Sequence, residues 1–472
     1  MITVLHLIDR LSGAGPTRSL VTLVKHLARL GAGQQHRVVV LRRDAYPMAL
    51  IQAKQAAMTL VREPDAETLR REVGAADIVQ LHYWNNPDIA RLLRMDLPAM
   101  RLLVWFKILG RHAPQVITER LLRYADGAVA TTPATLDLPV IRDAQRAGCP
   151  LVIDIVPGIA DFERLEGLSP RLHPNFTVGY IGTVGATKLH PRYVPMSAAV
   201  DVPGVRFVVC GAGRPDELRE EADRLGVARR FEWRGFVENI RPVLETLDVF
   251  GYPLCEDTYA TSEQSLQEAM MAGVPPVVFP HGGVKHLVAH EHTGLVVHRE
   301  QEYTEAIEHL YRHPDERARL GENARQYAQR AFDGGKAARA FAAIYGRMMS
   351  RPKRTRAWKG ATSDGARQFV EALGDASHDF GLSMTAPADA WGEADRRIAE
   401  VSPLLSSGEG GIFHYRNCHP DAPYLRLWAG LVLLRRRRFA EAISELEAAR
   451  EAGLPRERVS GYLDAAMQGL DG

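Results

Sequence analysis

The sequence predicts an α/β protein with two Rossmann-like, doubly wound domains that face a cleft, followed by an all-α domain. Three observations support this fold class. Short apolar runs alternate with stretches of helical periodicity as far as residue 350, and the alternation restarts after Pro157-Gly158. Beyond residue 350 the chain carries helical patterns only.

The first alternating series begins with an apolar run at residues 2–8, a Gly-containing segment and a helical stretch at residues 17–30. Short buried strands that alternate with helices indicate a parallel sheet covered on both faces. We therefore predict a first Rossmann-like domain over residues 1–165. Its expected strands are residues 2–8, 37–41, 78–81, 102–106, 127–131 and 152–156.

The second series predicts another doubly wound domain over residues 166–350. Helical patterns separate its apolar runs, and the segment 303–349 is helical enough to close the domain and to cross back to the first one. The expected strands are residues 176–182, 205–213, 230–233, 249–253 and 276–279.

The rest of the chain divides into a basic linker, residues 351–365, and a helical domain, residues 366–472. The linker is interpreted either as a solvated tether or as a patch that faces phosphate or lipid. Two amphipathic helices at residues 423–439 and 440–451 place small and aromatic residues as tetratricopeptide-like helix pairs do. A single repeat of this kind predicts a helical domain rather than a solenoid.

Composition excludes several classes of protein. The chain has 59 Lys and Arg against 57 Asp and Glu, so its net charge of +2 offers no general attraction for nucleic acid. Its four cysteines are scattered without metal-ligand spacing, and no apolar run is long enough for a membrane span. We expect a cytoplasmic protein without a metal site. The basic run 435–438 leaves peripheral contact with the inner membrane face open.

Glycine-containing loops follow the first strand of each predicted domain. Gly13 and Gly15 precede a helix, where backbone N–H groups can bind an anion or a sugar hydroxyl, although an ordinary turn explains them equally well. In the second domain a loop from Gly182 and Thr183 leads to Lys188 and Arg192, which either neutralise a pyrophosphate or are surface cations. The next strand ends in a similar loop with Gly211 and Gly213.

The segment 255–276 combines a helix start with acidic and hydroxyl side chains. Free N–H groups at Glu263, Gln264 and Ser265 are expected to face a phosphate, and Glu268 to accept both ribose hydroxyls. Helix starts also favour acids for structural reasons, so Glu263 is equally readily a capping residue.

These segments together resemble a known family. Glu268-Ala-Met-Met-Ala-Gly-Val-Pro, with Gly282 and Gly283 after it, resembles the nucleotide-sugar signature of family-4 retaining glycosyltransferases of the GT-B fold. The loops at residues 157–161, 182–188, 210–213 and 235–236 match the family pattern in order, over about residues 1–345. The resemblance implies retaining transfer of a hexose from a UDP- or GDP-sugar to a saccharide, lipid-linked or other hydroxyl acceptor. It implies no metal and no cofactor beyond the nucleotide sugar.

The same resemblance implies roles for individual residues. Lys188 would bind the diphosphate and Glu268 the ribose, while Gly282 and Gly283 would lie beside the sugar or phosphate. The loop over residues 12–17 would close over the donor.

The chain departs from the family pattern at three positions. Ala260 stands where the family has its first glutamate, so Asp257 or Glu263, and less readily Glu256, would have to replace it. Lys107 or His112 would have to replace a histidine after a strand of the first domain. Thr183 takes the place of a frequent arginine, which leaves Lys188 and Arg192 with more of the phosphate charge.

The acceptor is expected at the end of the first-domain strand that runs into His82, Tyr83, Trp84 and Asn85, where a sugar could stack on an aromatic ring. Simple packing of these aromatics is an equal alternative. Two other functions stay open: a nucleotide-sugar epimerase or hydrolase, and a non-catalytic nucleotide-sugar-binding scaffold or partner subunit whose C-terminal helices recruit a protein.

Overall fold

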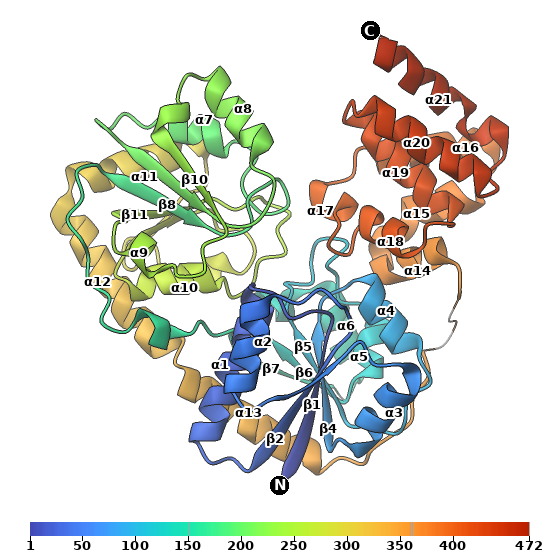
Figure 1. Cartoon of the computed structure of the whole chain (residues 1–472), viewed down its shortest axis with the longest axis horizontal. Helices are drawn as coiled ribbons and strands as arrows, with labels where there is room; N and C mark the ends of the chain where they lie inside the picture. Colours follow the sequence, from blue (N-terminus) through green and yellow to red (C-terminus); the bar gives the residue numbers. More distant parts are fainter. Residues whose placement is uncertain (150, 359, 361, 472) are drawn as a thin grey trace.

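A computed structural model describes residues 1–149, 151–358, 360 and 362–471 of the chain. Figure 1 shows two α/β units and a helical unit that stands on the first of them. The predicted linker and helical domain include residues 359, 361 and 472, which lie outside the described residues. The predicted fold class, two Rossmann-like units plus a helical region, is confirmed.

The first unit is built on a parallel seven-stranded sheet with the order β3-β2-β1-β4-β5-β6-β7. The sequence did not predict β3, a four-residue edge strand without a fully buried side chain. Central strands such as β4 are buried along their whole length, which is why their apolar runs stand out in the sequence. The strands are β1 Ile2–Ile8, β2 Gln34–Val40, β3 Thr59–Arg62, β4 Ile78–Tyr83, β5 Leu102–Phe106, β6 Gly127–Ala130 and β7 Val152–Ile155.

Helices cover both faces of this sheet. Helix α1 begins after Ala14 with a proline in its first turn and buries one stripe of side chains, including Leu20, Leu23 and Leu27. Asn86 caps α4 by accepting a hydrogen bond from the backbone N–H of Ile89. The helices are α1 Gly15–Arg29, α2 Pro47–Gln55, α3 Ala66–Ala75, α4 Pro87–Arg94, α5 Glu119–Tyr124 and α6 Pro139–Arg146.

The second unit has a parallel six-stranded sheet with the order β10-β9-β8-β11-β12-β13. Its strands are β8 Thr177–Ile181, β9 Arg206–Cys210, β10 Phe231–Gly235, β11 Val249–Tyr252, β12 Pro276–Val278 and β13 Leu295–Val296. The two-residue strand β13 was not predicted. The helices are α7 Tyr193–Ala198, α8 Asp216–Arg224, α9 Arg241–Leu244, α10 Gln264–Met271, α11 Glu300–Arg312 and α12 Pro314–Ala331.

The chain returns to the first unit through α13, Gly334–Met349, as predicted. Phe341 packs on Trp105 of β5 with ring centroids 4.6 Å apart, and the Tyr345 hydroxyl donates to the Gln80 side chain at 2.6 Å. The described start of the following basic segment, residues 351–358, is not a solvated tether. Arg356 is buried and pairs with Asp126 at 2.6 Å, so its charge neutralises a carboxylate of the first unit rather than facing solvent, phosphate or lipid.

The helical unit contains both predicted helices, and α19 ends at Arg435 rather than at residue 439. Helix α19 is buried from residue 427 to residue 433, so it is the central helix of the unit and not an amphipathic surface helix. Trp428 is fully buried and donates from Nε1 to Ser383 Oγ at 3.0 Å. The helices are α14 Gly365–Leu373, α15 His378–Thr385, α16 Ala388–Ala399, α17 Pro403–Ser406, α18 Ile412–Cys418, α19 Pro423–Arg435, α20 Phe439–Glu451 and α21 Arg456–Asp471.

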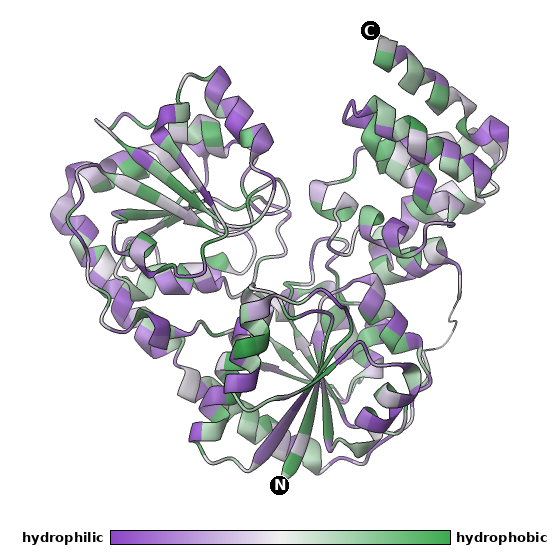
Figure 2. Ribbon diagram, viewed as in Figure 1, coloured by the Kyte–Doolittle hydropathy of each residue, from purple (hydrophilic) through white to green (hydrophobic). Residues whose placement is uncertain are grey.

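Hydropathy follows this architecture. Figure 2 shows hydrophobic strands at the centre of the first sheet and hydrophilic residues on the outer surfaces of the helices. Among the residues described, none of the helices combines the length and the apolar character needed to cross a bilayer.

Candidate active site between the two α/β units

A cavity of about 910 Å³ lies between the carboxyl ends of the two parallel sheets. In open α/β sheets this edge is where ligands bind, because loops and helix N-termini converge there. Side chains of both α/β units line the cavity, and the helical unit adds Leu404, Ser407 and Glu409.

Most residues predicted to bind a donor line this one cavity. They are Gly13, Gly15, Gly182, Thr183, Lys188, Gly211, Gly213, Glu263, Gln264, Ser265 and Glu268. Gly211 has a φ of 149°, and a Cβ there would lie 1.6 Å from the carbonyl oxygen of Gly182. Only glycine therefore lets these two loops approach each other beside the cavity.

Three of the predicted donor residues lie elsewhere. Arg192 is more than half exposed and pairs with Glu300 at 3.3 Å, away from the cavity lining. Gly282 and Gly283 pack beneath the loop that carries Ala260, and the N–H of Gly283 donates to the carbonyl of Ala260 at 2.9 Å. In this structure the two glycines support the cavity loop instead of facing the cavity.

Lys188 and Glu263 form a buried ion pair on the wall of the second unit. Lys188 Nζ lies 2.8 Å from Glu263 Oε2, and Glu263 also accepts hydrogen bonds from the Tyr252 hydroxyl and, at 3.1 Å, from Thr261 N–H. Burial alone would raise the pKa of Glu263, but Lys188 and these donors lower it below its usual value. The pair is therefore charged, and Lys188 already has a counter-ion.

Helix α10 begins at the cavity. Glu263 occupies the N-cap position in a left-handed conformation with φ 32°, but its side chain makes no capping hydrogen bond. The N–H groups of Gln264 and Ser265 have no hydrogen-bond acceptor among the described residues. The Gln264 side chain crosses to the first unit, where its Nε2 donates to Gly15 O at 2.9 Å and to Ser19 Oγ at 2.5 Å. This contact holds the two α/β units together at the mouth of α10.

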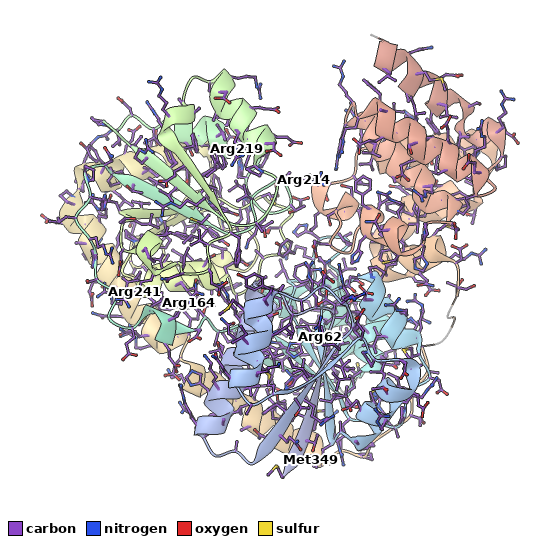
Figure 3. All side chains as sticks on the ribbon, in the orientation of Figure 1. Arg62, Arg164, Arg214, Arg219, Arg241 and Met349 are labelled. Atoms are coloured by element: carbon purple, nitrogen blue, oxygen red, sulfur yellow. The ribbon has the colours of Figure 1, made fainter. Side chains whose placement is uncertain are left out.

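Further along α10, Glu268 is buried and pairs with Arg164, whose Nε lies 3.2 Å from Glu268 Oε1. Figure 3 labels Arg164 beside the second unit. Burial raises the pKa of Glu268. Arg18, in the first turns of α1, also lines the cavity, and the described residues give it no ion pair. Arg18 and Arg164 belong to no motif in the sequence, and only the folded arrangement identifies them.

Only some of the residues proposed to replace the family's polar groups line the cavity. Lys107 follows β5 and lines the cavity, whereas His112 and Asp257 do not. Lys107 Nζ is buried without a hydrogen-bond partner among the described residues, 2.9 Å from the ring centroid of Trp105. This burial holds the pKa of Lys107 well below its usual value, so its ammonium loses its proton more readily than that of a surface lysine.

Three buried histidines lie next to Lys107. His6 Nδ1 is 3.1 Å from His82 Nε2, and His6 Nε2 is 2.9 Å from His36 Nδ1. Burial lowers the pKa of all three, that of His36 to about 4. At neutral pH this histidine chain is therefore uncharged. Of its three members, only His82 lines the cavity.

The predicted acceptor segment divides in the same way. His82 and Trp84 line the cavity, and the Trp84 ring meets Tyr259 edge to face at a centroid distance of 4.9 Å. Tyr83 is buried and donates from its hydroxyl to Val116 O at 3.2 Å. Asn85 donates to Pro114 O at 2.7 Å, so neither of these two residues lines the cavity.

Asp9 is a cavity residue that sequence reasoning missed. It follows β1 directly, and its Oδ2 accepts a hydrogen bond from the Asn86 side chain at 2.9 Å. Burial raises the pKa of Asp9 to about 6. An acidic residue directly after the first buried strand was the available signal. Tyr259, beside Trp84, was also missed.

The second unit matches a known family model. Residues 176–313 match the family model described as "Glycosyl transferases group 1". No curated protein matches the chain.

Solved structures share the fold at low sequence identity. A glycosyltransferase from Rickettsia africae is 12% identical with a TM-score of 0.60, covering 74% of this chain and 99% of its own. HepE of Anabaena, solved with UDP and glucose, is 17% identical with a TM-score of 0.57, and sucrose-phosphate synthase of Thermosynechococcus elongatus is 16% identical with a TM-score of 0.56. Both alignments cover 74% of this chain and 100% of the other. The chain thus has the GT-B fold, and residues 176–313 of its second unit match the glycosyltransferase group 1 model.

Proposed function

We propose that the chain is a retaining glycosyltransferase of the family-4 type. It transfers a hexose from a nucleotide diphosphate sugar to a hydroxyl of a saccharide or similar acceptor, without a metal. One observation carries the proposal: Lys188, the free N–H groups at the start of α10 and the loop at Gly211 converge on one cavity. Most of these groups belong to the segment that matches the glycosyltransferase model.

The charges of the cavity support a diphosphate. A nucleoside diphosphate gains negative charge as the sugar leaves, so fixed cations and N–H donors stabilise the transition state more than the ground state. Lys188 shares its charge with Glu263, whereas Arg18 has no ion pair among the described residues. We assign the diphosphate to the space between Lys188, Arg18 and the N–H groups of Gln264 and Ser265.

The proposed reaction breaks the bond between the sugar C1 and the phosphate oxygen. The acceptor oxygen forms its bond to C1 on the same face, and the acceptor proton passes to the departing phosphate oxygen. The two units contact each other beside the cavity, for example through the hydrogen bond of 2.7 Å from the Tyr46 hydroxyl to Glu238.

A thermal-shift screen with UDP, GDP, ADP and their sugars tests donor binding, because a ligand of the folded state raises the apparent melting temperature. UDP comes first, since HepE was solved with UDP and with UDP-glucose. Mass spectrometry of the products then separates transfer from hydrolysis and from epimerisation. EDTA should leave the rate unchanged. If no nucleotide stabilises the chain, the proposal is wrong.

A second function, nucleotide-sugar binding without turnover, is favoured by one observation. The position of the family's first glutamate is occupied by Ala260, which is buried. A Cβ added at Gly282 would lie only 3.1 Å from the Ala260 Cβ, so the two loops are tightly packed here and a larger side chain at residue 260 would require them to shift. Stable UDP binding without turnover on any acceptor would identify this alternative.

A further inference from the structure

The helical unit is firmly attached to the first α/β unit beside the cavity. Glu371 of α14 pairs with Arg94 at 2.8 Å and with Arg120 at 3.2 Å, and Asn85 Nδ2 donates to the carbonyl of Ala372 at 2.8 Å. These contacts place the unit at the carboxyl end of β4. They give it a fixed position on the first unit, unlike a tail held by a linker.

A segment of this unit, residues 402–411, reaches into the cavity wall. Its backbone is held by hydrogen bonds to the carbonyl of Glu409 from Gln115 Nε2 at 2.7 Å and from Trp84 Nε1 at 3.4 Å. Gly410 has a φ of 99°, and a Cβ there would lie 2.1 Å from Asn85 O, so only glycine allows this approach.

The segment presents polar side chains to the cavity. Both carboxylate oxygens of Glu409 accept from Arg10 Nη2 at 2.8 Å, and Ser407 accepts from the N–H of Glu409 at 3.2 Å. Glu409 lines the cavity and its side chain remains about half exposed, so its oxygens can accept further hydrogen bonds. Asp9 follows the neighbouring strand β1 and adds a second carboxylate, whose oxygens can accept hydrogen bonds from hydroxyl groups.

A continuous row of contacts connects the proposed donor site to Glu409. Thr183 Oγ1 lies 3.3 Å from the Tyr259 hydroxyl, Tyr259 packs on Trp84, and Trp84 donates to Glu409 O. Glu409 therefore lies on the far side of the aromatic pair from Lys188. A ligand that extends from the donor sugar past Trp84 would reach it.

We propose that residues 402–411 complete an acceptor subsite for a saccharide, in which Glu409 and Ser407 bind sugar hydroxyls beside Trp84. Carboxylate and hydroxyl oxygens next to an aromatic ring suit a ligand with polar edges and apolar ring faces. The inference rests on the proposed function and extends it. The helical unit acts here as a specificity element of the site.

The test uses the full chain on an array of immobilised neutral oligosaccharides, with UDP present. At least one immobilised oligosaccharide should bind the wild-type protein. Glu409→Gln should weaken the binding of the protein to this oligosaccharide roughly tenfold, because a hydrogen bond to a charged acceptor is lost. Ser407→Trp, which fills the subsite, should abolish oligosaccharide binding. Glu400→Gln is the matched control, since Glu400 lies in the same unit and pairs with Arg435 at the surface.

The thermal shift produced by UDP should stay the same in all of these variants. Loss of that shift in wild type would refute the proposed function itself. If the wild-type protein binds UDP but no oligosaccharide, the proposed acceptor subsite is wrong and the proposed donor site is unaffected. The same conclusion follows if Glu409→Gln and Ser407→Trp bind the oligosaccharide as tightly as wild type does.

Discussion

The two walls of the cavity are built in different ways. The wall of the second unit uses loops and a helix start that are each continuous in sequence, such as residues 182–188 and the beginning of α10. The opposite wall takes single side chains from separate strand ends, such as Asp9 and Trp84, and then adds Glu409 from the helical unit. The wall of the first unit, here called the first wall, is assembled only when the chain folds, whereas the wall of the second unit, the second wall, consists of local sequence motifs.

The strongest test of this contrast is Lys188→Ala. If Lys188 stabilises the departing diphosphate, turnover of the nucleotide sugar should fall by about 10² to 10³, as when a donor to developing charge is removed. The measurement is the initial rate of nucleotide release with saturating donor.

The control for this variant concerns stability, because Lys188→Ala also leaves Glu263 as a buried, unpaired charge. Adding Glu263→Gln should recover most of the lost stability in thermal unfolding without recovering turnover. Recovery of turnover in the double variant would show that Lys188 acts only on Glu263.

The next largest effect concerns the buried histidines below the first wall. Burial lowers the pKa of His36 from 6.5 to about 4, so the unfolded chain binds a proton between these values that the folded chain does not. Stability should therefore fall as the pH drops through this window, by up to about 3 kcal/mol for His36. In His36→Gln this loss should be smaller, as measured by chemical denaturation at a series of pH values.

His298→Gln is the matched control, since His298 is exposed on the second unit, and its stability profile should follow wild type. Asp9 acts in the opposite direction, because its pKa rises from 3.8 to about 6 and folded-state protonation then favours folding at lower pH. Asp9 is present in both proteins, so its contribution cancels when the stability profile of His36→Gln is subtracted from that of wild type. An unchanged profile in His36→Gln would contradict the assignment of a neutral His36.

Some parts of the molecule could be predicted from the sequence and others could not. Buried strands and glycine loops are local patterns, so both sheets and the loop around Gly211 that lines the cavity could be predicted. The short strands β3 and β13 contain only two apolar residues each, too few to predict a strand. Arg356 looked like a solvated cation because its partner Asp126 is distant in sequence. Trp84 donates a hydrogen bond to the carbonyl of Glu409, which is 325 residues away in the sequence, and no local pattern predicts such a contact.

A smaller effect is expected from Arg18→Ala, which tests whether the first wall contributes to donor binding. A lost charge-assisted hydrogen bond to phosphate should weaken UDP binding roughly tenfold in calorimetric titration. Arg29→Ala, at the other end of α1, is the control, since Arg29 is exposed and pairs with Glu163. UDP affinity equal to wild type in Arg18→Ala would assign donor binding to the second wall alone.

The smallest effect is expected from Arg192→Ala, although sequence reasoning gave Arg192 the same role as Lys188. Arg192 is more than half exposed, and its partner Glu300 lies outside the cavity, so a surface pair of this kind contributes little free energy. UDP affinity and turnover should therefore stay within about twofold of wild type, which calorimetry and rate measurements can resolve. A loss comparable with that of Lys188→Ala would mean that the loop from Thr187 to Arg192 rearranges when the donor binds. The phosphate site would then be completed by the ligand and not by the fold alone.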